Sequence, residues 1–402
     1  MKESGVDWIG QIPEEWEVTK LKYALLISNG KDYKDIEVEE GGYPVIGSGG
    51  VFARSRNYMY DGDVVLLGRK GTIDKPLFYS GKFWTVDTMF YSTALNGNNI
   101  KFMYYSSLLI PFSYYSTATA LPSMTQSDLN NHMLCLPSIS EQQKIADFLD
   151  KKTAQLDKVK ALLEEQIQKL KDYRASLIYE TVTKGLDKTV PMKDSGIDWI
   201  GQVPQGWGVK AIKYIFAEIG SGSTPKSDNE IFYDGDINWI QSGDLYQTDT
   251  VTSVSKTISY QGFKSTSALK IYQPPFVALA MYGASVGNVA VSYIDACVNQ
   301  AVVVMLGASE KVRFGKYAIE ASKNNLIFSA QGGTQPNISQ NLIKNWSIPQ
   351  PKSEEQVQIV DFLDKKTVQI DKLIQIKNEQ IKNINKQRQT LIYDYVTGKR
   401  RV

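Results

Sequence analysis

The sequence predicts an α+β protein in which two globular domains are joined by two long antiparallel helices that form a coiled coil, as a pseudo-twofold internal repeat. The first observation behind this prediction is the segment DFLDKKT, which occurs at 147–153 and again at 361–367, an offset of 214 residues (361 − 147). A longer match surrounds it, with EQQKIADFLDKKTAQLDKV at 141–159 and EQVQIVDFLDKKTVQIDKL at 355–373. Seven identical residues inside a longer match exceed what chance produces. The chain is therefore an internal duplication.

The second observation is that the start of each half also repeats. KESGVDWIGQIPEEWEVTKLKY at 2–23 recurs as KDSGIDWIGQVPQGWGVKAIKY at 193–214, so both halves have the same opening. We expect the four tryptophans of these openings to be packing anchors: Trp8, Trp16, Trp199 and Trp207. The predicted division of the chain is a domain over 1–138, a helix over 139–185, a domain over 186–350 and a helix over 351–402.

The third observation is the heptad spacing of apolar residues in the repeated helical segments. In the first helix the seam residues are Ile145, Phe148, Leu149, Leu156, Leu163, Leu170 and Leu177, with Val159 and Tyr173 filling positions between them. In the second helix they are Phe362, Leu363, Ile370, Ile374, Ile381, Ile384 and Leu391. Ser140 is expected to cap the first helix and Gly185 to end it. A helix over 141–184 would be about 66 Å long and could not bury its seam alone, so we expect the two helices to pair antiparallel.

The regions between openings and helices have the composition of strands and turns. Short apolar runs between Gly, Asp and Asn predict strands at 43–46, 64–67, 77–79, 83–86 and 89–91, and at 237–241, 276–281, 289–292 and 301–306. Helices are expected at 104–115, with a break at Pro111, and at 314–325. The turn at 68–72 has a counterpart near 283–287, and ATALPSMTQSDL at 118–129 resembles GGTQPNISQNLI at 332–343. Similar frames with different interiors suggest one scaffold that presents two recognition surfaces.

The bulk composition is that of an ordinary globular chain with several domains. It has 402 residues, of which 42% are hydrophobic, and a net charge of +2, so any nucleic-acid binding must be local. No run of 18 apolar residues and no apolar leader is present, which predicts a cytoplasmic protein. Cys135 and Cys297 suggest neither a disulfide framework nor a metal site. The single histidine, His132, is expected to be a partly exposed polar residue.

Catalytic motifs are weak. Gln273-Pro274-Pro275-Phe276 resembles the Asn/Asp-Pro-Pro-Tyr/Phe signature of amino-methyltransferases, and Gly220–Gly222 could act as a loop for S-adenosylmethionine. However, Gln replaces the usual Asn or Asp, and no clean parallel strand precedes the glycines. No GxxxxGK[ST] loop, nuclease arrangement of acidic residues or His/Cys cluster for zinc is found. Adenine methylation by this chain is therefore the least favoured of the functions considered, and no metal site or catalytic residue is predicted.

Local chemistry for DNA binding is more credible. Loop Arg and Lys side chains can reach phosphates, and Arg can grip guanine edges. The candidates in the first domain are Arg54, Arg56, Arg69, Lys70, Lys75 and Lys82. Those in the second domain are Lys226, Tyr246, Lys256, Lys264, Thr334 and Gln335. The segment 141–184 has nine Lys or Arg and eight Asp or Glu, which suits a spacer or a docking rod rather than a DNA clamp.

The chain resembles the specificity (S) subunit of type I restriction-modification systems. The resemblance lies in two DWIG-Q-(I/V)P-x-x-W openings, at Ser4–Trp16 and Ser195–Trp207, each followed by an EQ-x-x-I-x-x-FLD heptad helix, and it covers the whole chain. The segments GRKGTI at 68–73 and TVDTMFY at 85–91 also resemble parts of the target-recognition domains of that family.

The resemblance implies a non-catalytic DNA reader. Each domain would be a target-recognition domain for one half of a split, asymmetric site on double-stranded DNA, and the coil would set the gap between the halves. Two modification subunits would dock on the helices and restriction subunits would join them. S-adenosylmethionine, ATP and Mg would be bound by those partners, and no cofactor by this chain. The alternative from another class is a coiled-coil scaffold whose two domains bind proteins.

Overall fold

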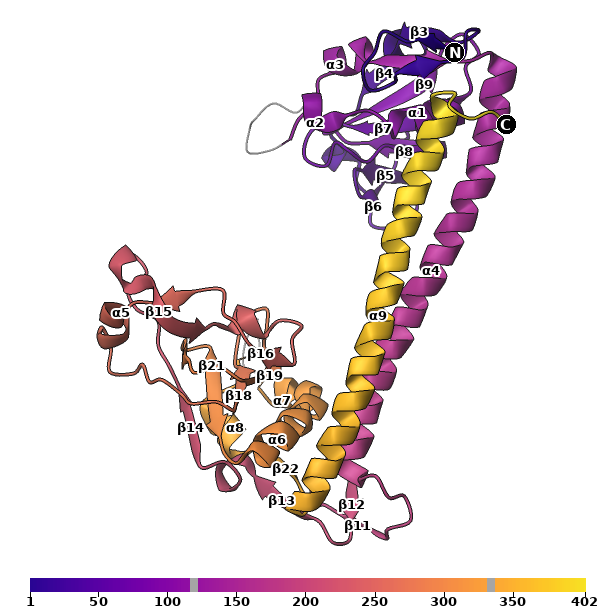
Figure 1. The fold of residues 1–402 in the computed structure, drawn as a ribbon. Helices are drawn as coiled ribbons and strands as arrows, with labels where there is room; N and C mark the ends of the chain where they lie inside the picture. The colour runs from indigo at the N-terminus through magenta and orange to yellow at the C-terminus, as the bar shows by residue number, and fades with distance from the viewer. Residues whose placement is uncertain (116–121, 331–336) are drawn as a thin grey trace. The chain divides into compact units, whose positions relative to one another are not determined.

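The computed structural model describes residues 1–115, 122–330 and 337–402, which form two compact units. Unit 1 consists of Met1–Glu164 and Lys377–Val402, and unit 2 of Glu165–Ile376. Two long helices, α4 (Ile139–Lys184) and α9 (Ser353–Val396), therefore contribute one half to each unit (Figure 1).

The ends of α4 follow from local chemistry. The Ser138 hydroxyl accepts a hydrogen bond from the Glu141 backbone N–H at 3.3 Å, so Ser138 caps the helix. The expectation that Ser140 is the cap was wrong, because the helix already includes that residue. Gly185 has a φ of +71°, which ends the helix in the left-handed conformation that glycine adopts at little cost, and Gly398 does the same after α9.

Within each unit the halves of α4 and α9 run antiparallel to each other. In unit 1 the rings of Phe148 and Tyr395 have centroids 4.5 Å apart, and Ile145 shares a buried core with Ile392 and Val396. In unit 2, Val182 of α4 shares a core with Ile359, Val360 and Leu363 of α9.

Burial along the seam is strongest near the ends of the helices. Ile145, Leu149, Leu363 and Ile370 are buried, whereas the remaining predicted seam residues are partly buried: Phe148, Leu156, Leu163, Leu170, Leu177, Phe362, Ile374, Ile381, Ile384 and Leu391. The assignment of Val159 and Tyr173 to the seam was wrong, because they are 47% and 54% exposed. Ile167 is buried and Arg174 partly buried, which shows that the inner face passes through these positions instead.

Two ion pairs link the helices at equivalent places of the repeat. Arg174 of α4 lies 3.4 Å from the Asp371 carboxylate in unit 2, and Arg388 of α9 lies 3.6 Å from that of Asp157 in unit 1. Both the arginines and the aspartates are separated by 214 residues (388 − 174 and 371 − 157), the offset of the repeat. Each pair therefore reproduces the other with the helices exchanged.

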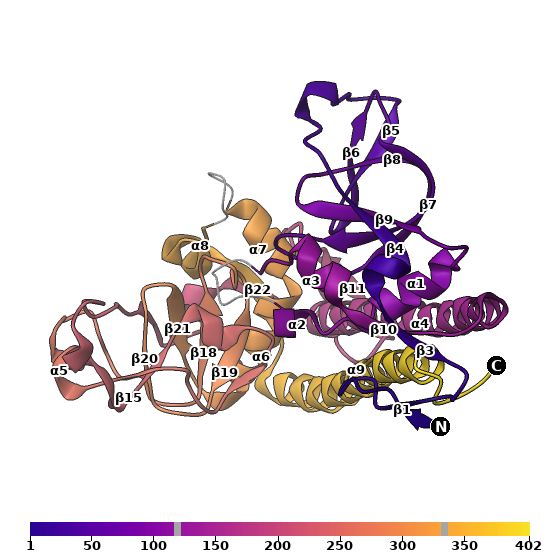
Figure 2. The same cartoon turned by 90° about the horizontal axis from the view of Figure 1, so that it is seen from above.

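The domain of unit 1 is built on a six-stranded sheet. Its strand order is β4 (Leu25–Asn29), β9 (Met89–Ala94), β7 (Tyr60–Gly68), β8 (Leu77–Thr85), β5 (Tyr43–Gly47) and β6 (Gly50–Ser55). All neighbours are antiparallel except β5 and β8. The strands expected at 77–79 and 83–86 form one strand, because the pairing of β8 with β7 continues through Gly81. Helix α1 (Ile100–Ser107) lies between this sheet and α4 (Figure 2).

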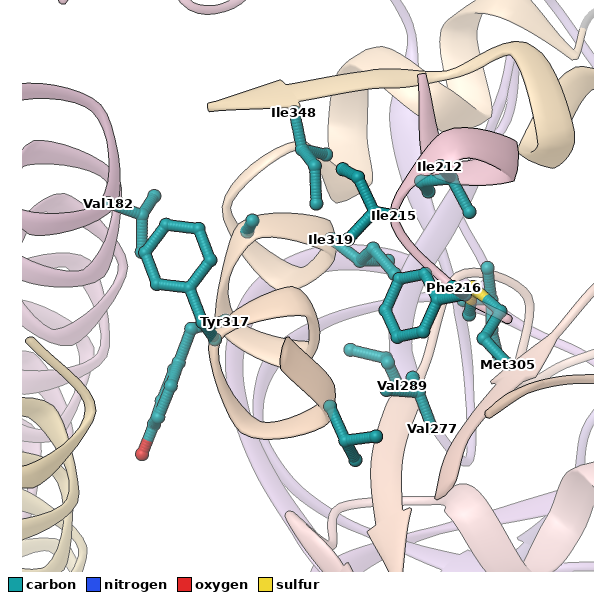
Figure 3. Packing of buried hydrophobic residues seen from close by; sticks show 14 of the residues in the cluster. Val182, Ile212, Ile215, Phe216, Val277, Val289, Met305, Tyr317, Ile319 and Ile348 are labelled. Carbon is teal, nitrogen blue, oxygen red and sulfur yellow. The ribbon is translucent and has the colours of Figure 1, made fainter. Parts of the chain in front are cut away.

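The domain of unit 2 repeats this frame, with its strands divided between two sheets. Its five-stranded sheet has the order β14 (Glu218–Ser221), β21 (Val302–Leu306), β18 (Phe276–Ala280), β19 (Val289–Ser292) and β16 (Thr250–Val251). The smaller sheet has the order β17 (Thr257–Ile258), β15 (Tyr233–Ile240) and β20 (Cys297–Val298). Helix α6 (Ser309–Ala321) packs Ile319 beside Phe216 and Met305 of this domain (Figure 3).

Four two-stranded ladders complete the fold. The pairs are β1 (Lys2–Glu3) with β2 (Gln11–Ile12), β3 (Glu17–Lys20) with β10 (Met133–Leu136), β11 (Met192–Asp194) with β12 (Gln202–Pro204), and β13 (Gly208–Ala211) with β22 (Ser347–Gln350). The short helices are α2 (Phe112–Tyr115), α3 (Gln126–Asn131), α5 (Tyr260–Lys264), α7 (Lys323–Ser329) and α8 (Gln340–Asn345). The break expected at Pro111 is confirmed, since Pro111 lies between α1 and α2, whereas the single helix expected at 314–325 is divided between α6 and α7.

One tryptophan of each opening, Trp16 or Trp207, attaches the opening to the start of a long helix in its own unit. The indole N–H of Trp16 donates to the Glu141 carboxylate at 3.0 Å, and that of Trp207 donates to Glu355 at 2.8 Å. No helix within the described ranges is long and apolar enough to cross a bilayer.

The expectation that His132 is partly exposed was wrong. Its ring is 2% exposed, stacks on Trp8 with centroids 5.4 Å apart, and places Nδ1 3.0 Å from the Tyr115 hydroxyl. Burial lowers the pKa of His132 to about 4. Trp346, stacked on Trp199 with centroids 6.3 Å apart, holds the corresponding place in unit 2. His132 therefore acts as a packing ring, as Trp346 does in unit 2, and not as an exposed polar residue.

Replacing His132 with phenylalanine is expected to make unfolding less sensitive to acid. Burial holds the folded pKa of His132 at about 4, below the ordinary value of 6.5, so the unfolded chain takes up the proton first as the pH falls. The stability that depends on neutral His132 is complete above pH 6.5, decreases as the pH falls below that value, and is fully lost below about pH 4. At pH 5 this loss lowers the free energy of unfolding by about 2 kcal/mol. Urea unfolding at pH 7 and pH 5 measures the difference, and equal losses for the wild type and His132→Phe would contradict it.

Candidate nucleic-acid interface

The candidate cations of the first domain fall into two groups at opposite ends of β7. Lys82 pairs with Asp61 near the start of this strand, whereas Arg69 follows Gly68 at its end. The strand has nine residues, and its length at about 3.3 Å per residue separates its ends by roughly 26 Å. The sequence did not show this separation, because Arg69 and Lys82 are close along the chain.

In the group near Lys82 the arginines are bound to backbone oxygens. One nitrogen of Arg54 donates to the carbonyls of Gly41 and Gly42 at 3.0 and 3.1 Å, and Arg56 donates to the carbonyl of Asp35 at 3.0 Å. The neighbouring segment 32–40 also carries five carboxylates: Asp32, Asp35, Glu37, Glu39 and Glu40. Arg54 and Arg56 thus hold a loop in acidic surroundings, which suits DNA phosphates poorly.

Lys82 and two tyrosines form a different kind of surface in the same group. The Lys82 ammonium lies 4.7 Å from the ring centroid of Tyr58 and 5.7 Å from that of Tyr43, and these two rings are 5.0 Å apart. Exposed aromatic rings beside a cation can contact sugars and bases.

In the second group the turn at 68–73 is joined to the segment that precedes α3. The Arg69 carbonyl accepts from the Met124 N–H at 2.9 Å, and the Gly71 N–H donates to the Pro122 carbonyl at 2.9 Å. Lys70 is exposed and pairs through its backbone with Ser123. Gly71 has a φ of +82°, a conformation that favours glycine at this turn. Lys70 and Lys75 therefore project from a well-supported loop, while Arg69 is partly buried and donates to the Asp87 carbonyl at 3.3 Å.

The second domain repeats the support of this turn but not its charge. The Met281 carbonyl accepts from the Ile338 N–H at 2.8 Å, as Arg69 does from Met124, and Met281 donates to the Ala301 carbonyl at 2.7 Å. The turn that follows, 282–287, reads YGASVG and has no cation. One frame thus carries two different sets of side chains.

The candidate residues of the second domain lie on the smaller sheet and its loops. Lys256 precedes β17, Lys264 is in α5 with its ammonium 5.6 Å from the Tyr260 ring centroid, and Lys226 precedes the turn before β15 (Figure 1). All three are exposed, as is Tyr246. Thr334 and Gln335 lie outside the described residues.

The glycine segment Gly220–Gly222, which could have been a cofactor loop, is explained by packing. A Cβ on Gly222 would lie 1.7 Å from the Val298 carbonyl oxygen, so glycine is needed there for the close approach of two strands. Gly30 stands in the same relation to Val86 in the first domain.

Both cysteines are buried, and burial raises the pKa of each thiol to about 12. In the part of the chain that the structure describes, no group of three or more His, Cys, Asp or Glu residues could hold a metal ion.

Comparison with known proteins agrees with this duplicated frame. The chain is 24% identical over 433 residues to a protein of Methanocaldococcus jannaschii that is provisionally named the MjaX type I restriction enzyme specificity subunit, an alignment that covers 98% of this chain and 96% of that protein. It is also 24% identical over 437 residues to the MjaVIII specificity subunit of the same organism, over 98% and 94% of the two chains.

A similar fold is found in a solved structure on complex assembly and conformational transition of the type I restriction-modification system. Its matching chain has a TM-score of 0.72 at 16% identity, with 96% of this chain and 98% of that chain covered, which establishes the likeness of the fold. The family model described as "Type I restriction modification DNA specificity domain" matches residues 13–171 and 204–386. Since these two matches cover most of the sequence, the chain belongs to the family of type I restriction-modification DNA specificity subunits, which are non-catalytic.

Proposed function

We propose that this chain reads a bipartite, asymmetric site on double-stranded DNA, with one half-site for each domain. The observation that carries the proposal is the shared frame: both domains support the turn after the central strand through the same backbone hydrogen bonds but present different side chains there. Two copies of one reader with different surfaces suit a site with two different halves. The domains over 1–138 and 186–350 would be the readers, and 139–185 and 351–402 the spacers between them.

The helix pair would set the gap and dock the partners. Its nearly balanced charge favours protein contact over phosphate contact. Two modification subunits would bind there and supply S-adenosylmethionine-dependent adenine methylation. Restriction subunits, with ATP and Mg, would complete the complex in the cytoplasm. A protein scaffold, the competing possibility, would show no preference for any DNA site.

Genome-wide mapping of N6-methyladenine tests this proposal. The cognate modification subunits would be expressed with and without this chain, and with a chimaera in which residues 24–138 come from a related protein. A split motif that requires the chain, and of which one half changes in the chimaera, is the expected result. Methylation that does not depend on the chain would contradict the proposal and favour the scaffold.

The loop that carries Lys70 is expected to contribute more to DNA affinity than the loop held by Arg54. Lys70→Glu should weaken binding of the complex with its modification subunits by about tenfold and reduce the salt dependence, since it replaces a phosphate contact with a repulsion. Arg54→Gln should leave the affinity unchanged and lower the melting temperature, because Arg54 holds the carbonyls of Gly41 and Gly42. Titration of labelled DNA at two salt concentrations measures both, and an unchanged affinity in Lys70→Glu would remove this loop from the interface.

A further inference from the structure

A polar clamp joins the first domain to α4. Asp150 of the repeated DFLDKKT segment accepts a hydrogen bond from the Tyr105 hydroxyl at 2.8 Å and pairs with the Lys101 ammonium. The Thr153 hydroxyl lies 3.1 Å from the same Tyr105 oxygen. Lys101 and Tyr105 are both in α1, so one helix of the domain is bound to one turn of α4 by several directional contacts.

The second domain has the same clamp on α9. Asp364 accepts from the Tyr317 hydroxyl at 2.6 Å and pairs with the Arg313 guanidinium, and Thr367 lies 3.3 Å from the Tyr317 oxygen. Tyr317 belongs to the buried cluster and lies on the side of α6 that faces the long helices (Figure 3). In both domains a cation and a tyrosine, four residues apart on a helix, hold the aspartate and the threonine of DFLDKKT.

The clamp explains which polar residues of DFLDKKT face the domain. Thr153 and Thr367 are buried, although threonine is usually exposed. By contrast Asp147, one turn before Asp150, is exposed and accepts only from Gln143 of its own helix among the interactions described. Asp147 is thus a matched control within the same segment.

Among the described residues, only those of the second domain form a further charged network on the helix pair. Arg174 of α4 contacts Asp249 at 2.5 Å and also pairs with Glu320, while Lys316 of α6 contacts Asp249 at 2.5 Å and Glu320 at 2.7 Å. The offset that relates Tyr105 to Tyr317 also gives the counterparts of Lys316 and Glu320 in the first domain. These counterparts are Tyr104 in α1 and Leu108 at its end. The described ion pairs of Arg388, the repeat equivalent of Arg174, include only Asp157.

We propose that Asp150 and Asp364 are positioning residues that fix the orientation of each domain on its helix and so restrict the gap between half-sites, with the first domain held less firmly than the second. This inference rests on the proposed function as a reader of a split site. Apolar packing between a domain and a helix has little directionality, whereas hydrogen bonds to one carboxylate define an angle. A tilt of about 5° moves the far side of a domain ~37 Å across by about 3.2 Å, which is close to one base-pair step.

Mapping of N6-methyladenine at sites with altered gaps tests the role of the clamp. Cells with the cognate modification subunits would carry the wild type, Asp147→Ala, Asp150→Ala, Tyr105→Phe or Asp364→Ala. Asp150→Ala and Tyr105→Phe are expected to raise methylation about tenfold at sites whose gap is one base pair longer or shorter, with both half-sites unchanged. Asp364→Ala should have a smaller effect because the network around Arg174 remains, and Asp147→Ala should match the wild type.

The outcomes separate positioning from simple loss of folding. A uniform decrease of methylation at the native gap, with no methylation at altered gaps in either Asp150→Ala or Tyr105→Phe, would overturn the positioning role. Equal relaxation in Asp150→Ala and Asp364→Ala would overturn the difference between the domains. Absence of any split motif with the wild type would instead contradict the proposed function itself. Tyr105→Phe keeps the buried ring, so its fold should be preserved even where the alanine variant is unstable.

Discussion

Insertion of seven residues into each long helix, after Gln166 in α4 and after Glu379 in α9, is expected to lengthen the gap of the methylated motif by about two to three base pairs. Seven residues add about 10 Å to a helix, and base pairs are about 3.4 Å apart along DNA. The two insertion points lie midway between the ion pairs Arg388–Asp157 and Arg174–Asp371, so the antiparallel pairing on both sides is kept.

The length of the insertion matters because the seam has a heptad spacing. Seven residues keep the apolar stripe on the same face, with a rotation of only about 20°, whereas an insertion of three residues displaces it and serves as a control for disrupted pairing. Mapping of N6-methyladenine reads the gap and both half-sites in one experiment. An unchanged gap in a folded, active seven-residue variant would show that the helices do not act as a ruler.

Arg174→Met is expected to destabilise unit 2 by about 3 kcal/mol, the lower end of the usual cost of removing one partner from a buried charge cluster, because the side chains of Asp249 and Asp371 are 38% and 52% exposed. The Arg174 side chain is 17% exposed and contacts Asp249, Glu320 and Asp371. Nearby carboxylates raise its pKa, although burial alone would lower it. Without Arg174, the three carboxylates would be left with Lys316 as the cation that contacts Asp249 and Glu320.

Arg388→Met is the matched control, since Arg388 occupies the equivalent position of the other helix. Arg388 lies 3.6 Å from the carboxylate of its partner Asp157, whose side chain is 59% exposed. Solvent therefore screens this ion pair, and its loss should lower the free energy of unfolding by less than about 1 kcal/mol. Hydrogen exchange of the backbone amides of α6 and α1 in the full chain measures the two units separately. Equal loss of protection in the two variants would contradict the view that the network stabilises the second domain specifically.

Local patterns in the sequence determined much of the architecture. Repetition requires only a comparison of residues, and heptad spacing is a property of a single helix, so both the duplication and a helix over 141–184 could be predicted, within two residues of α4 (Ile139–Lys184). The openings and the helical ends also carried the resemblance to the type I specificity family, to which the chain belongs. The DNA-contacting residues stay a prediction.

Only the tertiary structure decided which side chains meet. Tyr105 binds Asp150 across 45 residues of sequence, and Arg174 reaches Asp249 and Glu320 from another element, because the domains fold back onto the helices. Residue type was a poor guide in such places: His132 is buried as a stacked ring, and Val159 is exposed. Periodicity and repetition are local properties that a sequence displays directly. Burial, hydrogen-bond partners and the sharing of charge depend on surfaces that exist only after the chain has folded.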